Sequence, residues 1–163
     1  MNKVQLSIAL LSIMITGCST VSVSNFSLIE FGTVQTKLDK LSETDDPNFT
    51  DMNDVKFEKM LSESNHIPAK LGTEFGFRFE IIGEPSGEYI TVECAGTHPD
   101  LTNPHNGQSF SSYRYTDKYV IGRTVYYGFS FDEEWEIAPG TWILSIFYKE
   151  EKMLEKEFHV YIP

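Results

Sequence analysis

The chain has 163 residues, a formal net charge of -11 at pH 7 and 40% hydrophobic residues. This length suits one domain of ordinary size. The excess of acidic residues argues against nucleic-acid binding, which needs clustered Lys and Arg on the protein surface. It also argues against a protein that lies flat on anionic lipid. We therefore expect no nucleic-acid partner, and the acidity fits either solubility or a cationic partner.

Residues 1–18 have the pattern of a secretory signal. Lys3 precedes a short apolar run, LSIALLSIMIT at 6–16, which is well below the ~20 residues that a membrane-spanning helix needs. The basic flank and the short run are typical of a cleaved signal peptide. The run closes with Ile15-Thr16-Gly17-Cys18, which resembles the bacterial lipobox. That resemblance implies that diacylglycerol is attached to the Cys18 sulfur and that the chain is cut just before it.

This interpretation predicts a signal peptide at 1–17, a lipidated tether at 18–25 and a domain at 26–163. Two or three acyl chains, such as palmitate, hold a protein firmly on a membrane. Ser19 follows the cysteine, and a serine there resembles the outer-membrane signal of enterobacteria-like cells. We expect a lipoprotein of the bacterial cell envelope, anchored in the outer membrane and facing the periplasm. The alternatives are a plain secreted protein and a short uncleaved anchor.

The second of the two cysteines, Cys94, lies in YITVECAG, where alternation places it on one face of a strand. With Cys18 lipidated it has no partner within the chain. We expect a buried thiol that packs as a small hydrophobic residue. An intermolecular disulfide and a reactive thiol are the alternatives.

The first predicted strand covers 26–36, FSLIEFGTVQT, with Phe26, Leu28 and Phe31 in the buried set. Gly32 is expected to mark a bulge or a close approach of backbones. The next segment is acidic and lacks a clear period, so 37–66 is interpreted as a long surface loop with a short helix at 54–62.

From residue 67 the pattern is that of strands. GTEFGFRFEIIG alternates apolar and other residues with period two, as a half-buried strand does. EYITVECA continues in the same way, and GTHPDLTNPHNGQS at 96–109 is interpreted as a loop. FSSYRYTDKYVIG and RTVYYGFSFD follow as two strands that meet near Gly122, and TWILSIFYK and LEKEFHVYI form a final hairpin. About seven strands without crossover helices predict an all-β, antiparallel sandwich.

Two segments of the chain resemble a known family. They are IPAKLGTEFGFRF at 67–79 and YGFSFDEEWEIAPGTWILSIFYKEEKMLEKEFHV at 127–160, together with Phe31-Gly32 in the first strand. They are similar to a family of uncharacterised bacterial domains, domains of unknown function that are often borne on lipoproteins. The resemblance covers roughly residues 26–163 and implies an immunoglobulin-like fold. It implies no activity.

Three groups of residues are candidate functional sites. His98, Asp100 and His105 lie in one predicted loop and include two imidazoles that could hold a metal, but their spacing matches no strong signature. The acidic DDPNFTDMND at 45–54 lacks the glycine and the closing glutamate of a calcium loop. The aromatic residues form either a contact surface or cross-strand pairs of the core; they are Tyr113, Tyr115, Tyr119, Tyr126, Tyr127, Phe129, Phe131 and Trp135.

The sequence therefore predicts a membrane-anchored, non-catalytic module that binds or scaffolds an envelope protein or a glycan. No cofactor and no catalytic residue are expected. Two alternatives stay open: a metal-dependent hydrolase that uses the 96–108 loop, and a carbohydrate-binding module.

Overall fold

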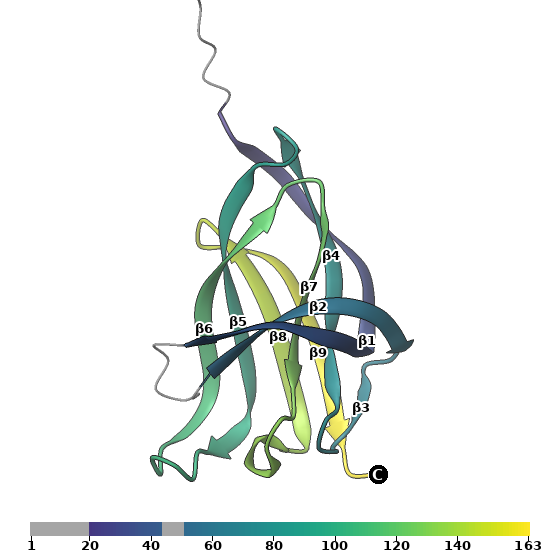
Figure 1. Cartoon of the computed structure of the whole chain (residues 1–163), viewed down its shortest axis with the longest axis vertical. Helices are drawn as coiled ribbons and strands as arrows, with labels where there is room; N and C mark the ends of the chain where they lie inside the picture. The colour runs from purple at the N-terminus through teal and green to yellow at the C-terminus, as the bar shows by residue number, and fades with distance from the viewer. Residues whose placement is uncertain (1–19, 44–50) are drawn as a thin grey trace, which may run out of the picture.

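The computed structural model describes residues 20–43 and 51–163. The expectations for the signal peptide, Cys18 and Ser19 lie outside these residues. Two sheets pack face to face as a sandwich (Figure 1). The elements are β1 Ser22–Glu43, β2 Asp51–Ser62, β3 His66–Pro68, β4 Glu74–Glu84, β5 Tyr89–Thr102, β6 Ser109–Val120, β7 Thr124–Ser130, the short helix η1 Glu134–Glu136, β8 Gly140–Tyr148 and β9 Glu151–Tyr161.

The first sheet has the strand order β2-β1-β4-β7, and the second has the order β3-β9-β8-β5-β6. Each neighbouring pair is antiparallel except β3 with β9, which run parallel. The predicted sandwich is confirmed, with nine described strands instead of about seven. The strands on either side of Gly122 were predicted correctly, but β6 and β7 belong to different sheets, so the chain crosses the sandwich at that turn.

The core lies between the sheets, where the predicted alternation places it. Phe75, Phe77, Phe79 and Ile81 of β4 are all fully buried. They face the alternating residues of the second sheet, which are also buried: Ile90, Val92 and Cys94 of β5, and Trp142, Leu144 and Ile146 of β8. Alternate residues of a strand point to one face, so the period-two pattern identified the buried face correctly.

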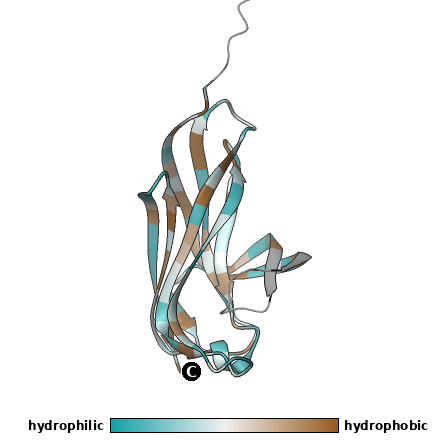
Figure 2. Ribbon diagram, turned by 90° about the vertical axis from the view of Figure 1, so that its left-hand side faces the viewer, coloured by the Kyte–Doolittle hydropathy of each residue, from teal (hydrophilic) through white to brown (hydrophobic). Residues whose placement is uncertain are grey.

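The segment 37–66 was wrongly interpreted as a loop with a short helix. β1 continues to Glu43 and pairs with β2, so most of this segment is a β-hairpin. Pairing of β1 with β4 ends at Val34, opposite Glu74. Residues 35–43 and 51–59, here called the arm, therefore form a two-stranded ribbon that projects from the sandwich (Figure 2).

Irregularities in strand pairing explain why the arm was missed. The β1–β2 register shifts at Thr33/Val34, at Gln35/Thr36 and at Leu38/Lys40. Each shift inserts an unpaired residue and reverses the faces beyond it. At 35–39 and 55–59, where the side chains are described, most residues are exposed. Strands without a buried face need no alternation of apolar and polar residues, so these segments carry no clear period-two signal.

The start of β1 also differs in detail from the prediction. β1 begins at Ser22, so residues 22–25 belong to the sheet and not to a tether. Leu28 is 39% exposed instead of buried, and the pairing with β4 is irregular just after it, between Leu28 and Glu30. Gly32 marks a close approach as expected, because a Cβ there would lie 2.0 Å from the Ser62 carbonyl oxygen.

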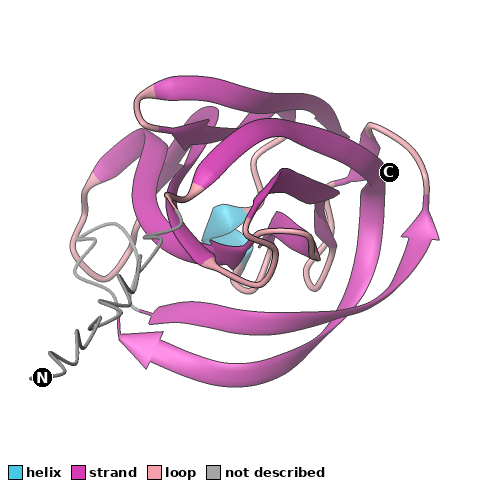
Figure 3. Cartoon of the chain, turned by 90° about the horizontal axis from the view of Figure 1, so that it is seen from above, coloured by secondary structure: helices cyan, strands magenta, loops and turns pink. Residues whose placement is uncertain are grey.

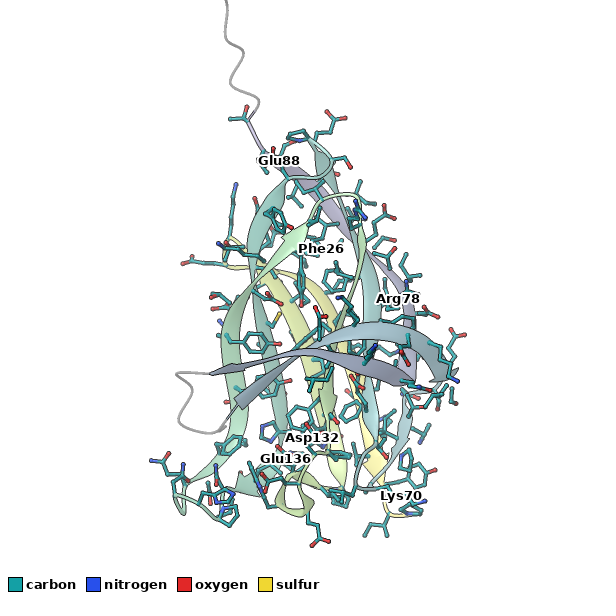
Figure 4. All side chains as sticks on the ribbon, in the orientation of Figure 1. Phe26, Lys70, Arg78, Glu88, Asp132 and Glu136 are labelled. Atoms are coloured by element: carbon teal, nitrogen blue, oxygen red, sulfur yellow. The ribbon has the colours of Figure 1, made fainter. Side chains whose placement is uncertain are left out.

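The sandwich has two distinct ends, as the labels of Figure 4 show. The N-terminal end, with Glu88, carries the start of β1 and the turns at 85–88, 121–123 and 149–150. The far end, with Lys70, Asp132 and Glu136, carries the loops at 69–73, 103–108 and 131–139. Seen from above, η1 lies in the middle of the ring of strands and closes the far end (Figure 3).

Candidate functional site

His98 lies in the core and not in a loop, because β5 continues to Thr102 and includes half of the segment interpreted as the 96–108 loop. Its ring stacks on the indole of Trp142 at 4.7 Å between centroids and on Tyr113 at 6.0 Å. Its Nδ1 donates to the carbonyl oxygen of Pro99 at 2.8 Å. Burial lowers the pKa of His98, so the neutral imidazole acts as a packing residue at neutral pH.

His105 lies in the exposed turn at 103–108 of the far end. Its backbone amide donates to the Asn103 side-chain oxygen at 2.8 Å, and its Nε2 lies 3.7 Å from the carboxylate of Glu133. Asp100 is exposed on β5. Over residues 20–43 and 51–163, no three His, Cys, Asp or Glu side chains converge in a metal-binding arrangement. The structure thus separates the three candidate ligands instead of assembling them.

The loop at 131–139 contains a buried carboxylate that the sequence analysis did not single out. Glu136 is 8% exposed. Its Oε2 accepts hydrogen bonds from the backbone amides of Asp132 and Glu133, both at 2.8 Å. Burial raises the pKa of Glu136 to about 7, although these amides oppose the rise. The signal that could have identified it is the spacing of Glu133 and Glu136, which is that of a capping box.

Hydrogen bonds connect this loop to its neighbours. The amide of Gly72 donates to the Phe131 carbonyl oxygen at 2.8 Å, and the amide of Phe131 donates to Thr73 at 3.0 Å. The indole nitrogen of Trp135 donates to Glu133 at 2.9 Å. The far end is therefore a set of loops joined by hydrogen bonds, with exposed polar groups and two exposed aliphatic side chains, Leu71 at 55% and Ile162 at 77%. Such a surface can bind a partner without carrying out chemistry.

The aromatic residues belong mainly to the core. Tyr113, Tyr127 and Phe131 are buried, and the other five are half-buried. The Tyr127 hydroxyl donates to that of Tyr113 at 3.2 Å, and the Cys94 sulfur lies 3.7 Å from the Tyr119 hydroxyl. Burial raises the pKa of the Cys94 thiol to about 12. The expected alternative of aromatic pairing across strands is the one that the structure shows, and Cys94 is buried as expected.

Within residues 20–43 and 51–163, no helix is long and apolar enough to cross a bilayer.

The chain is similar to a solved immunoglobulin-like protein from Pseudomonas aeruginosa, with 22% identity and a TM-score of 0.62 over 89% of this chain and 99% of that one. At this identity the likeness shows the fold alone. No curated protein matches the chain. A family model matches residues 22–160, so the chain belongs to the family described as Domain of unknown function (DUF3859), as the resemblance implied.

Proposed function

We propose that this protein is a membrane-anchored lipoprotein of the bacterial cell envelope, whose immunoglobulin-like domain is a non-catalytic binding or scaffolding module. The observation that carries the proposal is Ile15-Thr16-Gly17-Cys18 at the close of a short apolar run, just ahead of a complete sandwich. The membrane is bound through lipid on Cys18. The second partner is an envelope protein or a glycan, and the anchor lies in the outer membrane facing the periplasm.

The surroundings of the reactive side chains support a binding role. His98 stacks on Trp142 in the core. The Cys94 thiol is buried, and its raised pKa keeps it protonated at neutral pH. Glu136 accepts hydrogen bonds from two backbone amides of its own loop. These groups make their contacts within the fold, and the exposed far-end loops are the surface proposed for a partner.

Metabolic labelling tests the anchor. In a bacterial host, labelled palmitate should enter the wild-type protein, and a Cys18→Ser variant should take up none. Cys94 serves as an internal control, since it remains in the variant. A wild-type protein that is exported without label would refute the lipid anchor.

Site-specific cross-linking tests the binding role. A photo-reactive residue at Gln108, exposed at the far end, should trap a discrete envelope partner in intact cells. The same probe at Glu88, exposed at the N-terminal end, is the matched control and should trap none of that partner. Equal trapping at both positions would contradict a far-end binding surface.

Metal analysis tests the enzymatic alternative. Protein purified without chelator should contain no stoichiometric metal. His105 is exposed, so a His105→Ala variant should fold normally. Metal present at one equivalent in the wild type and lost in this variant would favour a hydrolase over the proposed module.

A further inference from the structure

We propose that the N-terminal end of the sandwich rests on the surface of the phospholipid bilayer, with Tyr89, Ile82 and the turn at 149–150 among the lipid headgroups. This inference rests on the lipid anchor at Cys18 proposed above. Beyond the anchor itself, the proposed orientation specifies which surface of the domain contacts the membrane and which end points away from it.

The stretch of chain between Cys18 and the first strand is short. The described structure begins at Thr20, two residues before the first strand residue, Ser22. Two Cα–Cα steps separate Cys18 from Thr20, so these two residues lie no more than roughly 7 Å apart. An acylated cysteine sits at the membrane interface. The N-terminal end is thereby held close to the headgroups, whereas a tether of eight residues would have left it free.

The side chains at this end suit that environment. Tyr89 is 67% exposed, Ile82 is 44% exposed and Val21 is 37% exposed. Tyrosine is enriched at membrane interfaces, where its ring and its hydroxyl meet different surroundings. An open cleft of about 410 Å³ lies between the start of β1 and the turn at 149–150, and its lining includes the apolar Val21 and Val23 and the charged Lys149.

The charges at this end show why the anchor is needed. The cations are Arg123, Lys149 and Lys152, and the acids are Glu84, Glu88, Glu150 and Glu151. Such a mixed surface has no net attraction for anionic lipid. The contact therefore depends on the covalent tether, and the domain without lipid should stay in solution.

The two ends of the sandwich are also far apart. The eleven residues of β9 run from the 149–150 turn to Tyr161 at the far end, a length of about 33 Å. With the N-terminal end on the bilayer, the far-end loops point into the aqueous space. A quencher in the headgroups can then distinguish the two ends.

Tryptophan quenching provides the test. The full lipidated chain is placed in phosphatidylcholine vesicles with and without a nitroxide on the lipid headgroup. Tyr89→Trp adds an indole at the N-terminal end, and Tyr161→Trp is the matched variant at the far end, where the native tyrosine is 46% exposed. We expect the nitroxide to reduce the emission of Tyr89→Trp. The emission of wild type and of Tyr161→Trp should not change, because Trp142 is in the core and Trp135 is at the far end.

Equal quenching of the two variants, or stronger quenching of Tyr161→Trp, would overturn the proposed orientation. A Cys18→Ser, Tyr89→Trp variant should not be quenched, and quenching as strong as with the anchor would overturn the tether argument. If the host adds no lipid, the proposed function fails, but the orientation can still be tested by coupling Cys18 to a maleimide phospholipid. Cys94 is buried and does not compete in that reaction.

Discussion

At the scale of single residues, Trp142 connects the two sheets. It is fully buried. Its ring lies 5.7 Å from that of Phe75 in the first sheet and 4.8 Å from that of Phe129. Its indole nitrogen donates to the Ala138 carbonyl oxygen at 2.9 Å, so the polar atom of the side chain is satisfied. The residue contributes both apolar burial and a link to the loop that closes the far end.

Replacing Trp142 by alanine should destabilise the fold by about 3–5 kcal/mol, since the lost burial leaves a cavity between the sheets. Chemical denaturation of the purified domain measures the change. Trp135→Ala, at a half-buried position, is the control and should cost much less. An unchanged midpoint for Trp142→Ala would show that the register of β8 is wrong.

Glu136 makes stability depend on pH. Burial raises its pKa from 4.5 to about 7, so the folded state keeps a proton that the unfolded state has released. Its contribution is complete below about pH 4.5 and is lost as the pH rises through 7, where a charge must be buried. The largest size of this effect is roughly 3 kcal/mol.

A Glu136→Gln variant should therefore gain stability relative to wild type between pH 5 and pH 8. The amide oxygen can still accept the two backbone hydrogen bonds, and it carries no charge. Melting temperatures of both proteins across this range provide the measurement. Burial also raises the pKa of Glu74, but Glu74 is present in both proteins, so the difference isolates Glu136. A constant difference from pH 5 to pH 8 would contradict the raised pKa.

At the scale of elements, the arm is joined to the sandwich at its root. Phe57 of β2 packs on Tyr126 at 6.0 Å between ring centroids, and the Arg78 guanidinium lies 4.2 Å above the Phe57 ring. The Thr36 hydroxyl donates to Glu74 at 2.7 Å. Tyr126 can lie across the first sheet because Gly76 and Gly128 leave room for its ring. A few contacts on the outer face of the sheet therefore hold the arm in place.

Phe57→Ala should loosen the arm and leave the sandwich folded. The cation–π contact contributes about 0.5–2 kcal/mol, and local opening is governed by such contacts. Hydrogen exchange should become faster at residues 35–39 and 55–59 and stay unchanged in β4, β5 and β8. Leu61→Ala, at a 58% exposed position of the same strand, is the control. Faster exchange throughout the domain would instead assign Phe57 to the core.

At the scale of the whole molecule, charge opposes compactness. The chain has a net charge of -11, and several of its ion pairs, such as Lys56–Asp39 and Arg114–Glu93, involve exposed groups. Exposed pairs stabilise little, whereas repulsion among many acids acts over the whole surface. Screening should weaken the repulsion more than it weakens these pairs.

Raising NaCl from about 50 to about 300 mM shortens the screening length from about 14 to about 6 Å. The melting temperature should rise by about 2–4 °C for each 1 kcal/mol gained. A Glu88→Gln, Glu150→Gln, Glu151→Gln variant, changed at three exposed positions, should respond less to salt. A melting temperature that falls with salt would show that the ion pairs outweigh the repulsion.

The sequence by itself determined the class of fold and most of the core. Period-two patterns in 74–84 and 89–95 identified the buried faces, because one face of each strand packs on the other sheet and the opposite face meets solvent. Only the tertiary structure decided the arm, the burial of His98 and the raised pKa of Glu136. Register shifts hide the arm from any periodic pattern. His98 is buried against Trp142, which is distant from it in the sequence. The pKa of Glu136 depends on how deeply its loop is buried, which the sequence does not show.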